Sequence, residues 1–206
     1  MTVSYDVLHL MKLDNDDEDI IHGQHPLAFS ARADANDDPT FKEAMKGPDW
    51  EGFLEAMKLE IEQLESMHSW NVVPRDNALR ERLSIISTTW VFKRKRFPDG
   101  SVKKLKAWFV VRGFEQIANV DYFDTYSPVV QWSTICLMFV LSILLGLKTC
   151  QVDYTLAFVQ AKAAPGTYIE MPKLFEVPGK VLELKRNLYG MCKAPRNFYR
   201  HLKKGL

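Results

Sequence analysis

The stretch TTWVFKRKRFPDGSVKKLKAWFVVRGF, residues 88–114, decides the fold. Two runs rich in β-branched and aromatic residues flank the turn signal Pro98-Asp99-Gly100, so we predict a β-hairpin. Side chains alternate along a strand, which places two sets on opposite faces of the second run: Lys104, Lys106 and Trp108, and Leu105, Ala107 and Phe109. The cationic, aromatic face fits either a platform for phosphate or nucleic acid or a solubilising outer face, and spacing alone leaves both open.

Upstream of the hairpin, an amphipathic helix is predicted from about Asp49 to Ser66. Apolar residues recur there at helical spacing, and Pro48 precedes the start. Residues 1–40 are acidic and weakly patterned, so we predict a mostly disordered leader. The net charge of the chain is +1, but acidic and basic residues are concentrated in different segments. Residues 1–39 contain nine acids and two bases, whereas residues 80–112 contain ten bases and two acids. Such segregation is consistent with a phosphate-rich partner or with a solvated face.

Downstream, the apolar run ICLMFVLSILLGL (Ile135–Leu147) has 13 residues. A bilayer span needs roughly 20, so we predict a buried helix with Ser133 or Thr134 as its N-cap, and no membrane partner. The next stretch, CQVDYTLAFVQA (Cys150–Ala161), is typical of a buried strand that carries a single acid, Asp153. A buried carboxylate without a partner is costly, which indicates a functional role.

The remaining segments alternate strand and helix signals. TYIEMP and VLELKRNLYG predict strands, and APRNFYRHLKKGL predicts a helix with Pro195 in its first turn. The mixed order of elements indicates an α+β fold. Hydrophobic content of 47% and aromatic content of 12% are typical of a globular protein. Three cysteines at unrelated spacings indicate small buried side chains in a reducing compartment, and no signal peptide is recognisable, so we expect a cytoplasmic or nuclear location.

Seven motifs in order carry a family resemblance: Trp70-Asn71, WVFKRKRFPDG, KAWFVVRGFEQ, DYFDTYSPVV, QVDYTLAFV, TYIEMP and NLYGMCKAPRNFY. Together they resemble the reverse transcriptase of Ty1/copia-type retrotransposons. The resemblance implies a partial reverse transcriptase domain over residues 41–206. Its fold would be a right-hand polymerase-like fragment of fingers and incomplete palm, with a β-hairpin, helices and a partial antiparallel palm sheet. The family enzyme copies RNA into DNA with two Mg²⁺ ions.

The resemblance also assigns roles to individual residues. Asp153 matches the family's first catalytic aspartate, which is a metal ligand, and the backbone carbonyl of Tyr154 is a further ligand and nucleotide contact. Phe158 matches the aromatic residue that excludes a 2′-hydroxyl, although core packing explains it equally. Gly190 and Pro195 match residues that line the incoming nucleotide and the template base.

Two basic residues of the hairpin, Lys106 and Arg112, match family positions that face the nucleotide. The implied partners are an RNA or DNA template–primer and a deoxynucleoside triphosphate. We also expect self-association through an exposed edge of the incomplete palm sheet.

Three departures from the family pattern bear on activity. Trp108 stands where the family has an arginine, and a tryptophan cannot supply a charge-assisted fork to phosphate. Cys192-Lys193 replaces Lys-Gln. The paired aspartates of the Tyr-x-Asp-Asp motif do not occur in the 206 residues. We therefore expect this chain not to polymerise DNA alone. A fragment or relic, part of a longer polymerase, and a non-catalytic nucleic-acid-binding module remain open.

Overall fold

The computed structural model describes residues 37–80, 83–117, 122 and 124–205. Within them, five α-helices and two sheets give an α+β fold, as the sequence predicts. The elements follow one another as α1 (Phe41–Lys46), α2 (Trp50–Ser66), β1 (Trp70–Pro74), α3 (Arg75–Arg80), β2 (Ile85–Ile86), β3 (Thr88–Arg96), β4 (Val102–Val111), the short 3₁₀ turn η3 (Gly113–Glu115), α4 (Trp132–Leu144), the 3₁₀ turn η4 (Ala157–Gln160), β5 (Tyr168–Ile169), β6 (Lys180–Leu184) and α5 (Ala194–Gly205).

The predicted hairpin is confirmed as the antiparallel pair β3–β4, in which Trp90 lies opposite Phe109. Its turn is closed by the Phe97 N–H, which donates to the Ser101 carbonyl at 2.9 Å. Gly100 has φ +89°, a left-handed conformation that residues with a Cβ rarely adopt. The Asp99 carboxylate accepts hydrogen bonds from the Ser101 hydroxyl and N–H, which lower the pKa of Asp99.

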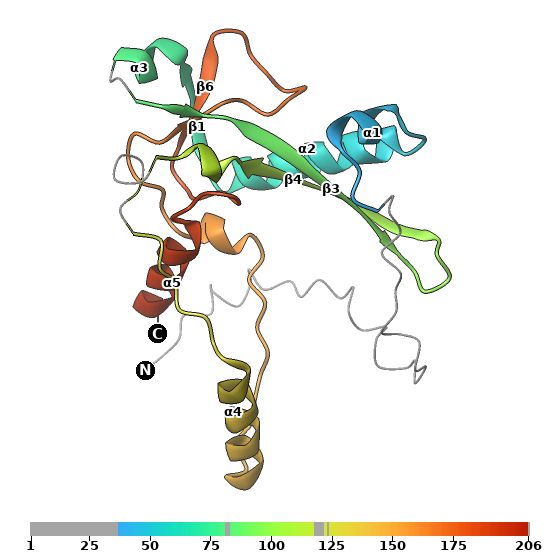
Figure 1. Cartoon of the computed structure of the whole chain (residues 1–206), viewed down its shortest axis with the longest axis vertical. Helices are drawn as coiled ribbons and strands as arrows, with labels where there is room; N and C mark the ends of the chain where they lie inside the picture. Colours follow the sequence, from blue (N-terminus) through green and yellow to red (C-terminus); the bar gives the residue numbers. More distant parts are fainter. Residues whose placement is uncertain (1–36, 81–82, 118–121, 123, 206) are drawn as a thin grey trace.

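The core lies between the inner face of this hairpin and α2 (Figure 1). Phe53 of α2 and Phe92 of β3 are fully or almost fully buried, and their ring centroids are 5.1 Å apart in an edge-on arrangement. Met57 and Leu64 continue the same face of α2, so the predicted amphipathic helix is confirmed. Each such side chain stabilises the fold by about 1.5–3 kcal/mol through burial.

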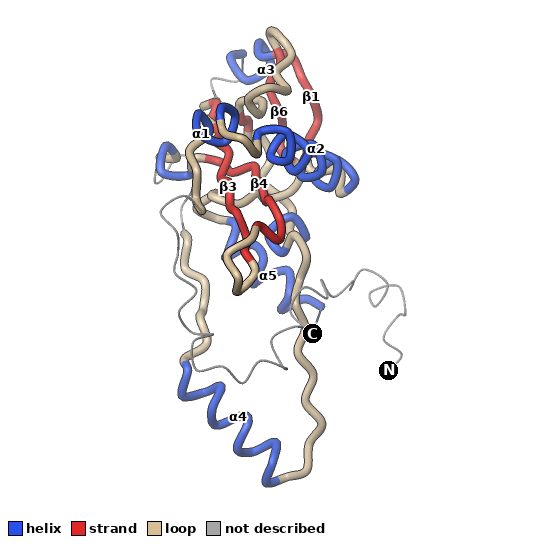
Figure 2. The backbone as a smooth tube through the Cα atoms, turned by 90° about the vertical axis from the view of Figure 1, so that its right-hand side faces the viewer, coloured by secondary structure: helices blue, strands red, loops and turns tan. Residues whose placement is uncertain are grey.

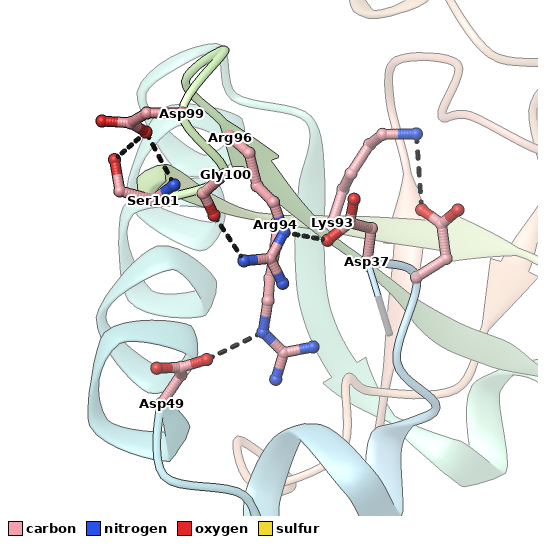
Figure 3. A network of polar contacts seen from close by, with 9 residues as sticks. Asp37, Asp49, Lys93, Arg94, Arg96, Asp99, Gly100 and Ser101 are labelled. Carbon is pink, nitrogen blue, oxygen red and sulfur yellow. Dashed lines mark hydrogen bonds and ion pairs between the residues drawn. The ribbon is translucent and has the colours of Figure 1, made fainter. Parts of the chain in front are cut away.

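Three ion pairs fix the hairpin to the segment before α2 (Figure 3). The buried Arg94 donates to Asp49, the N-cap residue of α2, at 2.7 Å. Arg96 donates to Asp37 at 2.6 Å, and Lys93 lies 3.4 Å from Asp38. Three of the hairpin's cations therefore have structural partners. Asp37 and Asp38 belong to the predicted acidic leader, the rest of which, residues 1–36, lies outside the described residues.

The second sheet has the strand order β1–β6–β5–β2. Its β1–β6 and β5–β6 pairs are antiparallel, whereas β2 and β5 pair in parallel, so the sheet is antiparallel in part. A two-residue strand can join in either direction, because so few ladder bonds are involved. The predicted strands in TYIEMP and VLELKRNLYG are confirmed as β5 and β6.

The predicted strand Cys150–Ala161 is wrong. Residues 150–154 are extended and exposed without a strand partner, and η4 follows at Ala157. Alternating apolar residues favour a strand only where a neighbouring strand can pair with it, because unpaired backbone groups otherwise turn to water. Asp153 is therefore exposed, and the prediction that it is buried is also wrong.

The predicted apolar helix is α4, but its predicted burial is wrong. It begins after Gln131, which makes no side-chain cap, and none of its described side chains is buried. Figures 1 and 2 show it projecting away from the other elements. Cys136 in α4 and Cys150 beyond it are exposed as well, contrary to the prediction of buried cysteines. Among the described residues, no helix has both the length and the apolar character needed to span a bilayer.

Candidate functional site

The turn around Gly190 packs backbone against backbone at the end of β4. The Val111 N–H donates to the Tyr189 carbonyl at 2.9 Å. Gly190 has φ +88°, and a Cβ placed on it would lie 2.0 Å from the Val111 carbonyl oxygen. A Cβ placed on Gly113, just after β4, would likewise lie 2.0 Å from the Gly190 carbonyl oxygen. Only glycine fits both positions, which explains Gly190 without reference to a ligand.

Four rings form an aromatic group beside this turn: Tyr154, Phe158, Tyr189 and Phe198. Phe158 of η4 packs edge-on against Tyr189 at 5.1 Å and against Phe198 at 6.1 Å. Tyr154 packs edge-on against Phe198 of α5 at 5.6 Å. The contacts join η4, α5 and the turn after β6. They place two predicted site residues, Tyr154 and Phe158, against the same ring, Phe198.

Asp153 directly precedes Tyr154 in the chain, and its negative charge affects the pKa of Tyr189. Burial raises the pKa of the Tyr189 hydroxyl, and the negative charges of Glu60 and Asp153 raise that pKa further. The Asp153 side chain itself is exposed to solvent.

Glu60 of α2 is a buried acid, and it is the second group whose charge raises the pKa of Tyr189. Its carboxylate accepts a hydrogen bond of 3.4 Å from the Phe109 N–H on the outer edge of β4. Burial raises the pKa of Glu60 to about 7, and the Phe109 hydrogen bond opposes that rise. Glu60 and the Tyr189 carbonyl accept hydrogen bonds from the Phe109 and Val111 N–H groups at the free edge of β4. Another strand could otherwise pair with these groups.

Two further predicted residues lie around the same turn. Pro195, in the first turn of α5, accepts a hydrogen bond of 3.4 Å at its carbonyl from the Ser127 hydroxyl. Arg112 follows β4 directly; its N–H donates to the Ser87 carbonyl, and its guanidinium lies 3.9 Å from Glu115. The Ser87 hydroxyl and N–H, helped by Arg112, lower the pKa of Glu115.

Lys106, in contrast, lies away from this group. It is six residues before Arg112 along β4, roughly 20 Å at the rise of a β-strand. The cross-strand register places it opposite Lys93, and it places Lys95 opposite Lys104. These four residues form the lysine face, next to the Val91–Trp108 pair on the outer side of the hairpin. Like charges directly opposite in a ladder destabilise it.

Two of the three departures from the family pattern, at Trp108 and at Cys192, have structural settings in the described residues. Trp108 lies next to the lysine face, opposite Val91 in the ladder. The Cys192 N–H donates to the Gln116 side chain at 2.9 Å, and its thiol donates to the Gly113 carbonyl at 3.2 Å. Cys192 therefore secures the turn to the end of β4.

Sequence reasoning missed Tyr189, Phe198 and Glu60. The aromatic residues on both sides of the Gly190 turn, in NLYG and RNFY, were a signal for the first two. The helical spacing of α2 was a signal for Glu60, because it places this acid on the same face as Phe53, Met57 and Leu64.

The described side chains do not by themselves fit a pair of metal ions. They contain no group of three or more His, Cys, Asp or Glu residues placed to hold one. Asp153 offers a single exposed carboxylate, and Mg²⁺ requires several hard oxygen ligands in octahedral geometry.

Comparison with known proteins identifies the fold's family. Residues 68–206 match the family described as reverse transcriptase (RNA-dependent DNA polymerase). The chain belongs to this family. It is of the Ty1/copia type, and reverse transcriptases generally use divalent metal ions. No solved structure matches the chain.

Curated relatives of this reverse transcriptase segment are long polyproteins. The Pol polyprotein from transposon TNT 1-94 of Nicotiana tabacum is 32% identical over 170 residues, which cover 81% of this chain and 12% of the relative. The Pol polyprotein from transposon RE1 of Arabidopsis thaliana is 30% identical, with 87% of this chain and 12% of the relative covered. The Ty1-ER2 Gag-Pol polyprotein of Saccharomyces cerevisiae is 30% identical, with 74% of this chain and 8% of the relative covered. The chain thus spans 12% or less of these three relatives.

Proposed function

We propose that these residues form the part of an RNA-directed DNA polymerase that holds the template–primer and the incoming nucleotide. The observation that carries the proposal is the aromatic group at the Gly190 turn, which joins Tyr154 and Phe158 to α5 and to the turn bonded to the end of β4. In this proposal the hairpin with α1 and α2 corresponds to the fingers. The segment from Asp153 to η4, together with α5, corresponds to the palm.

The roles assigned within this site follow from chemistry and position. Asp153 provides the exposed carboxylate, and the carbonyl of Tyr154 lies next to it in the chain. Phe158 presents a ring for stacking against a sugar, while its contacts with Tyr189 and Phe198 hold that ring in place. Arg112 provides a cation near the turn, where a triphosphate would need one.

The second part of the proposal concerns catalysis. The 206 residues supply one of the carboxylates that a two-metal mechanism needs and lack the Tyr-x-Asp-Asp pair. We expect the chain to bind template–primer but to show no primer extension by itself. A primer-extension assay with labelled primer checks this, and extension above that of an Asp153→Asn control would contradict it.

A second candidate function, a nucleic-acid-binding module, is favoured by the lysine face. Lys93 opposite Lys106 and Lys95 opposite Lys104 place four cations on one face of the hairpin, along which a phosphate backbone can lie. Trp108 adds a ring on which a base can stack. This function does not require the carboxylates of a polymerase, so it can operate whether or not catalysis does.

Binding of a fluorescent template–primer at several salt concentrations tests both candidates. We expect affinity to fall as salt rises, with a logarithmic slope of about −0.7 to −0.9 per phosphate neutralised. The double variant Lys104→Gln/Lys106→Gln should reduce both affinity and slope. Its matched control is Lys42→Gln/Lys58→Gln, which removes the same charge from α1 and α2. Flat, weak binding by the unmodified chain would refute both functions.

A further inference from the structure

A cationic hollow lies outside the site described above, between α5 and the segment that follows η4. It has a volume of about 280 Å³. Its charged and polar lining consists of Asp124, Lys162, Lys193, Arg196, Asn197 and Arg200. Among the described residues, the lining thus brings together four cations and one carboxylate. This lining contains none of the residues of the lysine face or of the aromatic group.

The two walls of the hollow are held at a fixed separation. The fully buried Asn187 donates to the carbonyls of Ala161 and Lys162 at 3.0 and 2.9 Å. It accepts a hydrogen bond of 3.1 Å from the Asn197 amide of α5. A buried, fully bonded amide of this kind rigidifies the elements that it joins. The hollow therefore exists before any ligand arrives.

One cation of the hollow is already oriented. Arg196 pairs with the Asp124 carboxylate and also donates to the Asp124 carbonyl at 3.3 Å. The Arg196 side chain is 23% exposed, so it is held in place while the hollow still reaches it. Lys162 and Arg200 are exposed, and no carboxylate among the described residues is paired with either of them.

The charged residues at the start of α5 are also unusual for a helix N-terminus. A helix N-terminus carries a partial positive charge and normally has acids in its first turn. The first turn of α5 has no acid; Arg196 lies in it, and Lys193 directly precedes it. An anion in the hollow would offset both the clustered side chains and the helix dipole. A phosphate group matches this need, because arginine and lysine together provide a fork and point charges for its oxygens.

We propose that this hollow binds a phosphate group of a single-stranded nucleic acid, at a site separate from the lysine face and the nucleotide site. The proposal rests on the proposed function, since it adds a second anchoring point for the same strand.

The test uses the full chain and a fluorescein-labelled single-stranded DNA oligonucleotide, with inorganic phosphate as a competing probe. The variant Lys162→Gln/Arg200→Gln removes two exposed cations from the hollow. The control Lys203→Gln/Lys204→Gln removes the same charge from the last turn of the same helix. We expect the first variant to weaken binding by about tenfold and to reduce the salt slope by about 0.7, the contribution of one phosphate contact. The control should change affinity less than about twofold, because its cations are near no contacted phosphate.

The outcomes separate the two proposals. Equal losses in both variants would overturn the hollow as a site, because the effect would then be one of net charge. Unchanged binding in the first variant would overturn it too, while leaving the proposed function intact. If inorganic phosphate binds and the Lys162→Gln/Arg200→Gln variant abolishes that binding, but the oligonucleotide does not bind, the nucleic-acid source is refuted. If neither probe binds to the unmodified chain, the hollow and the proposed function both fail.

Discussion

The hairpin and α4 are both rich in apolar residues, yet they have opposite environments. In the hairpin, Phe92, Phe109 and Val111 are buried against α2 and the Gly190 turn, and charged residues cover the outer face. In α4, Ile143 and Leu144 are 82% and 74% exposed, and no described element packs on the helix. Apolar composition alone therefore does not determine burial. The difference is whether partner surfaces exist within the chain.

The largest expected effect comes from removing a core ring of the hairpin. Phe92→Ala should lower the free energy of unfolding by about 3–5 kcal/mol, because it deletes buried surface and leaves a cavity beside Phe53. The matched control is Phe139→Ala in α4, whose side chain is 58% exposed. It should change stability by less than about 0.5 kcal/mol. Urea unfolding followed by tryptophan fluorescence measures both, and equal losses would contradict the contrast between the regions.

The next effect concerns the pH dependence of the hairpin region. The pKa of Glu60 is about 7 in the folded chain against an ordinary value of 4.5, so the folded state keeps a proton that the unfolded state releases. Stability should therefore fall as pH rises from about 4.5 to about 7 and stay lower above that range, by at most about 3 kcal/mol.

Glu60→Gln keeps the acceptor for the Phe109 N–H and removes the charge. It should be more stable than the unmodified chain at pH 8 by about 1–3 kcal/mol and similar to it at pH 4. Glu62→Gln, at an exposed position on the same helix, is the control. A Glu60 variant with the pH dependence of the unmodified chain would show that this carboxyl is not the titrating group.

The smallest effect on stability is expected in α4, where the consequence is association. Self-association was predicted through a sheet edge and stays a prediction; α4 offers a further apolar surface for it. Ile143→Lys/Leu144→Lys should shift sedimentation towards the monomer and leave the unfolding midpoint nearly unchanged. The control Leu59→Lys/Leu79→Lys changes two exposed leucines in α2 and α3. Should both variants associate as the unmodified chain does, α4 is not the contact.

The sequence predicted the parts of the fold that depend on local patterns. The Pro98-Asp99-Gly100 turn, the spacing of Phe53, Met57 and Leu64, and the helix at Pro195 involve interactions within a short stretch. The strand at Asp153 was mispredicted, because a strand requires a partner that the apolar alternation cannot specify. The burial of α4 was mispredicted for the same reason.

The candidate site divides in a similar way. Phe158 and Gly190 were named from motifs, and the structure brings them together through the contact between Phe158 and Tyr189, whereas Lys106 lies elsewhere on the hairpin. Tyr189, Phe198 and the cationic hollow depend on how α5 docks against η4, which motif order does not reveal.

Hydrogen–deuterium exchange with and without template–primer tests the central claim most directly, because it reports on both regions at once. Binding should slow exchange in the hairpin, residues 88–111, and in residues 188–200 around the Gly190 turn. Exchange in α4 should be fast in the free chain and unchanged on binding, because no described element covers that helix. Protection confined to α4, with none in the hairpin or the turn, would contradict the account.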